Sequence, residues 1–235
     1  MTAFVLSFWL ICRRINQKKN SFNVTIDNIY DFAVGALLVS LISARIYYVL
    51  FNLKEYKARP LEIFKVWNGG LAIYGAIIGL ILYAIVFCKK KKINFYNLAD
   101  LIVPYLALSQ SIGRWGNFIN QEAYGGITNL PWKMGVFDNV VGEYIYVHPT
   151  FFYESICTFT LFLILMKLSK NRGFEGQIFF SYMIGYGLVR SIVEGFRADS
   201  LMLGIFRISQ VLSVIFVVLF GILYFYKKSC RTKVV

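Results

Sequence analysis

Four side chains able to ionise or donate hydrogen bonds recur at helical spacing in the stretch YGLVRSIVEGFR. They are Tyr186, Arg190, Glu194 and Arg197. At about 100° per residue these positions span roughly 80° of arc, so a helix places all four on one face. Arg190 and Glu194 can also pair at i, i+4. An interfacial ion pair with a snorkelling arginine is the simpler interpretation, but the shared stripe favours a functional site.

A second polar cluster, GRWGNFINQEAYGG at 113–126, ends an apolar stretch of the chain. Arg114 and Asn117 share a helix face if the helix continues this far, and Glu122 and Gly125 follow them. The glycines of the cluster allow backbone to approach a ligand closely, and N–H groups exposed there suit an anion. A glycine-rich loop whose asparagines form hydrogen bonds is the alternative.

Three further positions stand out within or beside apolar stretches. Tyr74 would lie next to a GxxxG face formed by Gly75 and Gly79, for which helix packing alone is the alternative. His148, the only histidine, opens a later apolar stretch, where a structural role is the alternative. Arg45 lies about a turn from the outer end of its helix, where snorkelling explains it adequately.

These residue types indicate the binding of a phosphate. Arg114, Arg190 and Arg197 offer planar forks of donors that match phosphate oxygens and remain charged. Glu122 and Glu194 could orient those arginines or bind hydroxyl groups. The sequence contains no metal-ligand cluster and no nucleotide-binding loop, and its four cysteines lack CxxC spacing, so neither a metal nor a cofactor is expected. The combination points to an anionic phospholipid.

The elements that must position these residues follow from composition. Of 235 residues, 58% are hydrophobic and 16% are charged, against about 25% charged in ordinary soluble domains. Because a spanning helix needs roughly 20 apolar residues, we predict an all-α polytopic membrane protein with seven transmembrane helices. The first helix is short, as if its outer half were missing. The apolar stretches are 3–12, 29–51, 71–88, 98–112, 150–166, 177–193 and 204–226.

The net charge of +13 is arranged in basic clusters that follow alternate apolar stretches. The positive-inside rule therefore predicts an outer N-terminus and a cytoplasmic C-terminus. Residues 1–235 then form a single transmembrane catalytic domain, with 114–149 as an extracytoplasmic insertion that forms a small head segment. A nucleic-acid surface would not alternate with the crossings, so the lipid bilayer is the expected partner and nucleic acid is not.

Four motifs resemble the prolipoprotein diacylglyceryl transferase family, and they occur in that family's order and spacing. They are WNGGLAIYG, GRWGNFINQEAYG, HPTFFYE and YGLVRSIVEGFR. The pattern GRxGNFxNxExxG is highly specific, and the other three are moderately so. The resemblance covers most of the chain. It implies a seven-helix enzyme of the bacterial cell membrane whose active site faces the extracytoplasmic side.

The resemblance also implies a reaction. Phosphatidylglycerol gives its diacylglyceryl group to the thiol of the lipobox cysteine in a preprolipoprotein, which forms a thioether and releases glycerol phosphate. The partners are therefore phosphatidylglycerol and preprolipoprotein lipobox segments. The expected catalytic residues are Tyr74, Asn117, Glu122, Tyr186, Arg190 and Glu194, and the expected phosphatidylglycerol-binding residues are Arg114, Gly125, Arg197 and His148.

The chain departs from the family pattern in two places. Some members carry a histidine before the glycine corresponding to Gly75, where this chain has Tyr74. A histidine base at that position cannot apply here, so the base that deprotonates the thiol is unassigned. The family's N-terminal Trp-Tyr-Gly element also has no counterpart in this chain.

Two rival functions remain open at this level. A transporter or channel for an anionic solute would use the arginines as a selectivity element. It predicts paired repeats or broken helices in corresponding halves, and neither is visible in the sequence. A non-catalytic lipid-binding subunit is the third possibility.

Overall fold

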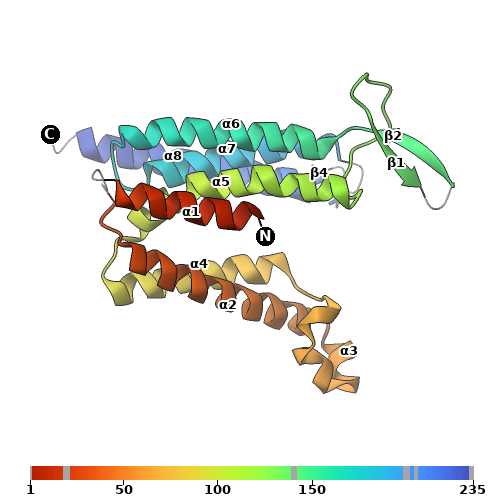
Figure 1. The fold of residues 1–235 in the computed structure, drawn as a ribbon, viewed down its shortest axis with the longest axis horizontal. Helices are drawn as coiled ribbons and strands as arrows, with labels where there is room; N and C mark the ends of the chain where they lie inside the picture. Colours follow the sequence, from red (N-terminus) through yellow and green to blue (C-terminus); the bar gives the residue numbers. More distant parts are fainter. Residues whose placement is uncertain (1, 18–21, 139–141, 198–201, 204–205, 233–235) are drawn as a thin grey trace. The chain divides into compact units, whose positions relative to one another are not determined.

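The computed structural model describes residues 2–17, 22–138, 142–197, 202–203 and 206–232 (Figure 1). The chain forms two compact units, and each is described by itself. One unit contains Met1–Arg13 and Ala99–Val235, and the other contains Arg14–Leu98.

The unit Arg14–Leu98 is built on two packed helices, α2 (Ile26–Phe51) and α4 (Ile73–Lys91). The GxxxG face of α4 lies against α2. A Cβ added to Gly75 would come within 2.5 Å of the Ser43 carbonyl oxygen, and one added to Gly79 would overlap the Ser43 side chain. Close helix packing is therefore a sufficient reason for both glycines.

A connection without strands joins these two helices. It contains α3 (Leu53–Ala58), η1 (Pro60–Phe64) and η2 (Val66–Asn68). Arg45 holds it, because this side chain is only 7% exposed and donates hydrogen bonds of 2.6–3.4 Å to five backbone carbonyls. The carbonyls belong to Glu62, Ile63, Lys65, Gly69 and Gly70. The snorkelling interpretation of Arg45 is wrong, since the guanidinium turns into the protein and finds its partners there.

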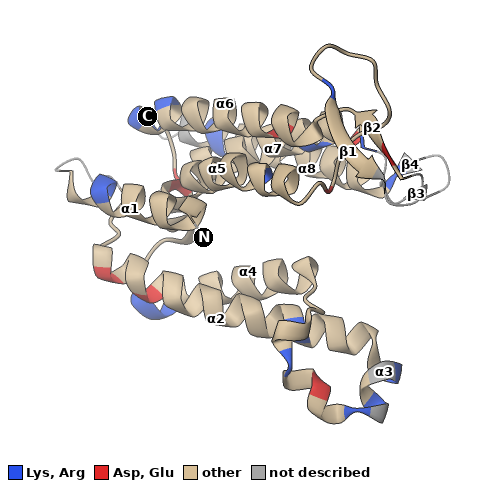
Figure 2. Cartoon of the chain, turned by 45° about the vertical axis from the view of Figure 1, so that its right-hand side comes forward, with Lys and Arg blue, Asp and Glu red and all other residues tan. Residues whose placement is uncertain are grey.

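The other unit is a bundle of helices that lie side by side in Figures 1 and 2. The helices of the bundle are α1 (Thr2–Asn16), α5 (Phe95–Ile119), α6 (Thr150–Lys170), α7 (Gln177–Glu194) and α8 (Ile208–Thr232). The core of the bundle combines apolar side chains from α5, α6 and α7. The core residues are Val103, Ala107, Leu161, Leu165, Ile178 and Tyr182. α6 and α8 run in the same direction, and both carry basic residues at the end away from the hairpin of β1 and β2 (Figure 2).

The start of α7 is fixed by a carboxylate from α5. Gly176 precedes the helix and has no side chain to cap it. The fully buried Asp100 instead accepts hydrogen bonds from the backbone N–H groups of Gly176, at 2.8 Å, and Phe179, at 2.7 Å. Arg172 also donates to this carboxylate at 3.2 Å. Asp100 thus acts as an N-cap from another helix and sets the position of α7 against α5.

A β-hairpin lies between α5 and α6. Strands β1 (Met134–Asp138) and β2 (Glu143–Val147) pair antiparallel, with Met134 opposite Val147. Met134 and Val136 of β1 and Val147 of β2 are buried and form a small hydrophobic cluster. The hairpin falls inside the segment 114–149 that the sequence analysis expected to form a small head.

A helix occupies each of the seven predicted apolar stretches. By length and composition, four helices in the described part of the chain could cross a membrane, namely α2, α4, α6 and α8. These four helices are consistent with the predicted all-α polytopic membrane protein. The prediction lacked two short sheets, the hairpin and the pair β3 (Met202–Leu203) and β4 (Phe206–Arg207). Seven crossings and the predicted orientation stay predictions.

Candidate active site

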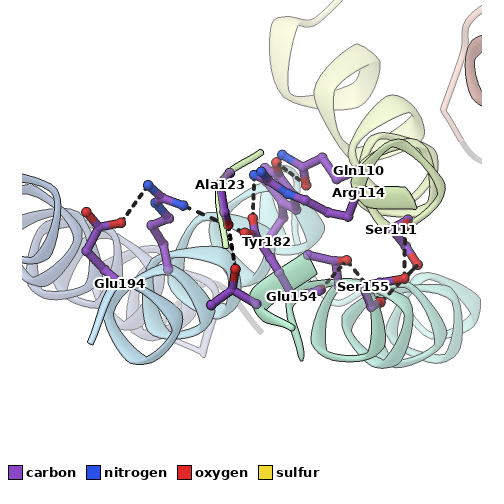
Figure 3. Close-up of polar contacts among 11 residues, drawn as sticks. Gln110, Ser111, Arg114, Ala123, Glu154, Ser155, Tyr182 and Glu194 are labelled. Atoms are coloured by element: carbon purple, nitrogen blue, oxygen red, sulfur yellow. Dashed lines mark hydrogen bonds and ion pairs between the residues drawn. The ribbon is translucent and has the colours of Figure 1, made fainter. Parts of the chain in front are cut away.

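Three helices bring together a chain of alternating charges. Arg114 of α5 approaches Glu154 of α6, with 2.5 Å between Nη2 and Oε1. The other oxygen of Glu154 lies 3.7 Å from Nη1 of Arg190 on α7. Arg190 also pairs with Glu194 one turn later, with 2.6 Å between Nη2 and Oε2. Figure 3 shows Arg114, Glu154 and Glu194 together with the dashed lines that mark polar contacts among the drawn residues.

Burial differs between the two signs of charge. The side chains of Glu154 and Glu194 are 2% and 3% exposed, whereas those of Arg114 and Arg190 are 23% and 21% exposed. Within the described residues, Glu154 Oε1 and Glu194 Oε2 meet the arginines at ion-pair distance but outside hydrogen-bond geometry. The carboxylates therefore form the floor of the site, and the guanidinium groups are the parts that a ligand can reach.

Hydrogen bonds between α5 and α6 keep the first ion pair in place. Ser111 Oγ donates to the Ser155 carbonyl oxygen at 2.9 Å, and Ser155 Oγ donates to the Ser111 carbonyl oxygen at 2.9 Å. Trp115 Nε1 donates to Ser155 Oγ at 3.2 Å. Because Ser155 and Trp115 directly follow Glu154 and Arg114 in sequence, these bonds fix the helices at the level of the charges.

Tyr186 joins the same site from α7. Its hydroxyl group lies within electrostatic reach of Glu154, Arg114 and Arg190, and its ring stacks on that of Tyr182 at a centroid distance of 5.8 Å. The Tyr182 hydroxyl donates to Gln110 Oε1 at 3.1 Å (Figure 3). Tyr186 and Arg190 therefore lie on one helix, α7, as their spacing predicted, and both lie near Arg114 of α5.

The end of α5 forms a compact turn around Glu122. Asn117 Nδ2 and Asn120 Nδ2 donate to Glu122 Oε1 at 3.2 and 3.1 Å, and the Glu122 N–H donates to the Asn117 carbonyl oxygen at 3.0 Å. α5 extends past Asn117, so the prediction that Arg114 and Asn117 share a helix is confirmed. Glu122 is exposed and lies at the solvent-facing end of this arrangement.

Gly125 is the crossing point of three segments. Its N–H donates to the His148 carbonyl oxygen at 2.9 Å, and an added Cβ would lie 2.7 Å from the Phe196 carbonyl oxygen. No larger residue fits without displacing backbone. Gly113 and Gly116 lie within α5, where an added Cβ would meet open space. For those two glycines the alternative of a glycine-rich loop does not hold, because the helix continues through them.

Arg197 does not continue the α7 stripe. The helix ends at Glu194, and Arg197 forms an isolated β-bridge with Gly125. The prediction of four residues on one helical face is therefore wrong for Arg197. The backbone turns at Gly195 to pair with the segment that follows α5, and this pairing takes precedence over further helix.

His148 lies beside the chain of charges, in a group of its own. Its Nδ1 is 3.3 Å from the Tyr153 hydroxyl group, to which Trp132 Nε1 donates at 2.8 Å. Its ring also packs against Phe196 at a centroid distance of 5.5 Å. All four residues line an apolar cavity of about 470 Å³ between α6, α7 and the segment that precedes β1.

Tyr74 belongs to the other unit. It is 57% exposed in the first turn of α4. Arg114 and Arg190 belong to the unit that contains Ala99–Val235, so a role for Tyr74 beside them stays a prediction.

Two residues of the site had no assigned role in the sequence analysis. Glu154 connects both arginines, and its signal is a glutamate inside the apolar sequence TFFYESICTF, since ionisable residues in apolar helices are costly and usually functional. Arg207 donates to the Glu194 carbonyl oxygen at the end of α7. No helical periodicity indicates Arg207, because it precedes α8 and is not part of α7.

Apolar helices around a group of paired charges define a polytopic helical membrane protein with an ionic site inside one of its units. The family model described as prolipoprotein diacylglyceryl transferase matches residues 1–226. The chain belongs to the prolipoprotein diacylglyceryl transferase family.

Three curated relatives, each similar over most of its length, carry the name phosphatidylglycerol–prolipoprotein diacylglyceryl transferase. The protein of Listeria welshimeri is 42% identical over 224 residues, which cover 93% of this chain and 79% of the relative. That of Clostridioides difficile is 47% identical over 192 residues, covering 82% and 75%. That of Finegoldia magna is 46% identical over 197 residues, covering 83% and 77%.

Proposed function

We propose that this chain transfers the diacylglyceryl group of phosphatidylglycerol to the lipobox cysteine thiol of preprolipoproteins, in a bacterial cytoplasmic membrane and on its extracytoplasmic side. Family membership and the names of the relatives support the reaction. The observation that carries the proposal is the pair of partly accessible arginines, Arg114 and Arg190, held over buried carboxylates. Nothing among the relatives favours the alternative of an anion transporter.

The chemistry needs a cationic site for the leaving group. The thiolate sulfur forms a bond to the glycerol carbon, while the bond from that carbon to the phosphate oxygen breaks and its electrons leave with the phosphate. Negative charge therefore grows on the phosphate in the transition state. Guanidinium groups fixed before the reaction stabilise that charge without reorganising. Arg114 and Arg190 suit this role, and Glu154 holds Arg114 in place.

The polar turn after α5 suits the remaining headgroup. Asn117 and Glu122 present amide and carboxylate groups one turn beyond Arg114. Such groups bind hydroxyls, and the headgroup of phosphatidylglycerol ends in a glycerol with two of them. Gly125 keeps this turn against the chain that precedes α6, and Arg197 adds a cation near the same turn.

The thiol proton needs an acceptor, because the thiolate is the attacking species. We propose His148 for this step, since imidazole is the side chain that ordinarily changes charge between pH 5 and 8. Tyr74 is assigned a hydrogen-bonding role, as neutral phenol is a poor base. Tyr74→Phe should then lower turnover only modestly, and a null Tyr74→Phe enzyme would refute its hydrogen-bonding role.

His148→Gln should lose most transfer activity while the protein still binds phosphatidylglycerol. Near-normal turnover of this variant would refute the assignment of His148 as the base.

One assay separates the proposed function from its rivals. Purified protein is incubated with glycerol-labelled phosphatidylglycerol and a lipobox peptide, and with a Cys→Ser peptide as the control. Thioether formation on the cysteine peptide, with release of labelled glycerol phosphate, is expected. Lipid binding without transfer would indicate a subunit, and anion flux into proteoliposomes without transfer would indicate a transporter.

A further inference from the structure

The ionic site is balanced before any ligand arrives. Arg114 and Arg190 carry two positive charges, and Glu154 and Glu194 carry two negative ones. Glu154 contacts both arginines, whereas Glu194 contacts Arg190. A phosphate that reaches the two guanidinium groups therefore enters a site in which Glu154 and Glu194 already neutralise the arginines.

The proposed reaction changes the charge of the phosphate that occupies this site. The substrate is a phosphodiester with one negative charge. The product is a phosphate monoester, which carries almost two negative charges when the pH is above its second pKa of about 6. Two arginines without counter-anions would attract the dianion more strongly than the monoanion, because Coulomb energy scales with charge and is weakly screened away from water. Such a site would retain its product.

We propose that Glu154 is a positioning carboxylate that makes the site select monoanionic phosphodiesters and release dianionic phosphate monoesters. This proposal rests on the proposed function. Glu154 acts through Arg114 and Arg190, which it holds from different helices at 2.5 and 3.7 Å. Because its side chain is only 2% exposed, solvent does little to weaken its charge. Glu194 contributes in the same direction, through Arg190 alone.

The test compares two soluble phosphates of different charge. Deacylated phosphatidylglycerol is a monoanionic diester, and glycerol phosphate is largely dianionic at pH 8. Their dissociation constants are measured by titration calorimetry on the purified protein in detergent. Glu154→Gln keeps the shape of the side chain and removes its charge, so preference for the dianion over the monoanion should rise about tenfold or more.

The control is Glu143→Gln, which neutralises an exposed carboxylate on β2 and should leave the preference at the wild-type value. If Glu154 only supported the structure, its substitution would weaken the binding of both phosphates by the same factor. Equal weakening of both in Glu154→Gln, or an unchanged preference, would overturn the proposal.

A second variant covers the case in which Glu154→Gln does not accumulate. Glu194→Gln should shift the preference in the same direction by a smaller factor, and an unchanged preference there would likewise overturn the proposal. Failure of the proposed function shows separately, as absence of thioether formation by the wild-type protein. The calorimetric comparison does not depend on turnover.

Discussion

At the scale of single residues, the shape of the guanidinium group matters as much as its charge. Arg114 pairs with Glu154 and also lies within electrostatic reach of the Tyr186 hydroxyl group. A lysine ammonium is a point charge that cannot make both contacts and still face a phosphate.

Arg114→Lys should therefore lose activity by at least about 100-fold, the loss typical of removing one fixed donor from a transition-state site. Transfer to the lipobox peptide measures this, with membrane accumulation followed by immunoblot. Arg59→Lys is the matched control, because Arg59 is in an exposed pair with Glu62. Near-normal turnover of the Arg114 variant would remove this residue from the phosphate site.

Arg190 and Glu194 should behave as a coupled pair. Removing Arg190 leaves the buried Glu194 carboxylate without its 2.6 Å partner, and a buried charge without a partner is costly. The double variant Arg190→Ala/Glu194→Ala should therefore lose less activity and thermal stability than the sum of the two single variants. Melting temperatures and kcat/KM for all three variants give the coupling. Strictly additive losses would show that the two side chains do not interact.

The spacing of residues in the sequence predicts contacts within one helix better than contacts between helices. Tyr186, Arg190 and Glu194 could be placed together because the helical period is fixed. Glu154 received no role, since its partners come from α5 and α7 and no local pattern records them. Arg197 was misplaced because a backbone pairing with Gly125 ends the stripe, and pairing of distant segments leaves no signal in helical spacing.

At the scale of elements, α7 is held by charges at both ends. Asp100 and Arg172 fix its start, and Glu154 contacts Arg190 in its last turns. The polar stripe of α7 therefore cannot rotate without breaking contacts to α5 or α6.

Asp100→Ala should lower stability substantially, since it removes the carboxylate beside Arg172 and the cap of α7. Breaking a buried pair typically costs about 3–5 kcal/mol. The melting temperature in detergent measures the effect. The control is Asp31→Ala, which breaks an exposed pair with Lys91 and should leave the melting temperature nearly unchanged. Equal shifts in the two variants would contradict the capping role.

The long helices could be predicted because apolar runs of sufficient length leave few alternatives. The ends of these helices could not be predicted. α5, for example, continues into polar residues whose hydrogen bonds are made among themselves, as between Asn117 and Glu122. The hairpin was missed for a related reason. MGVFD and EYIYV are short strands, and their pairing depends on a small core formed with neighbouring segments. The two sheets need tertiary contacts that periodicity alone does not reveal.

At the scale of the whole molecule, orientation decides which substrates can reach the site. In the helical bundle, α6 and α8 end with basic residues, and the hairpin lies at the opposite end (Figure 2). This arrangement suits a cytoplasmic basic end and an extracytoplasmic hairpin.

In a background without native cysteines, Asn129→Cys should react with a membrane-impermeant maleimide in intact cells. Lys170→Cys, on the exposed end of α6, should react only after permeabilisation. The reverse pattern would overturn the orientation and the proposed access to exported preprolipoproteins.

Arg45 has a consequence for how this protein can diverge. The hydrogen bonds by which Arg45 holds the connection between α2 and α4 all go to backbone carbonyls, and its guanidinium also lies over the Tyr56 ring, 5.3 Å from the centroid. Every residue type supplies a carbonyl, so these hydrogen bonds do not constrain the side chains at Ile63 and Lys65, whereas an added Cβ at Gly70 would overlap Arg45 Nη1. Substitution of Ile63 or Lys65 should therefore preserve the shape of the segment, whereas Arg45→Lys should not, which limited proteolysis in detergent can compare. Surface side chains such as those at Ile63 and Lys65 can therefore change without loss of the hydrogen bonds from Arg45. The segment could thus acquire new binding partners while its backbone keeps its conformation.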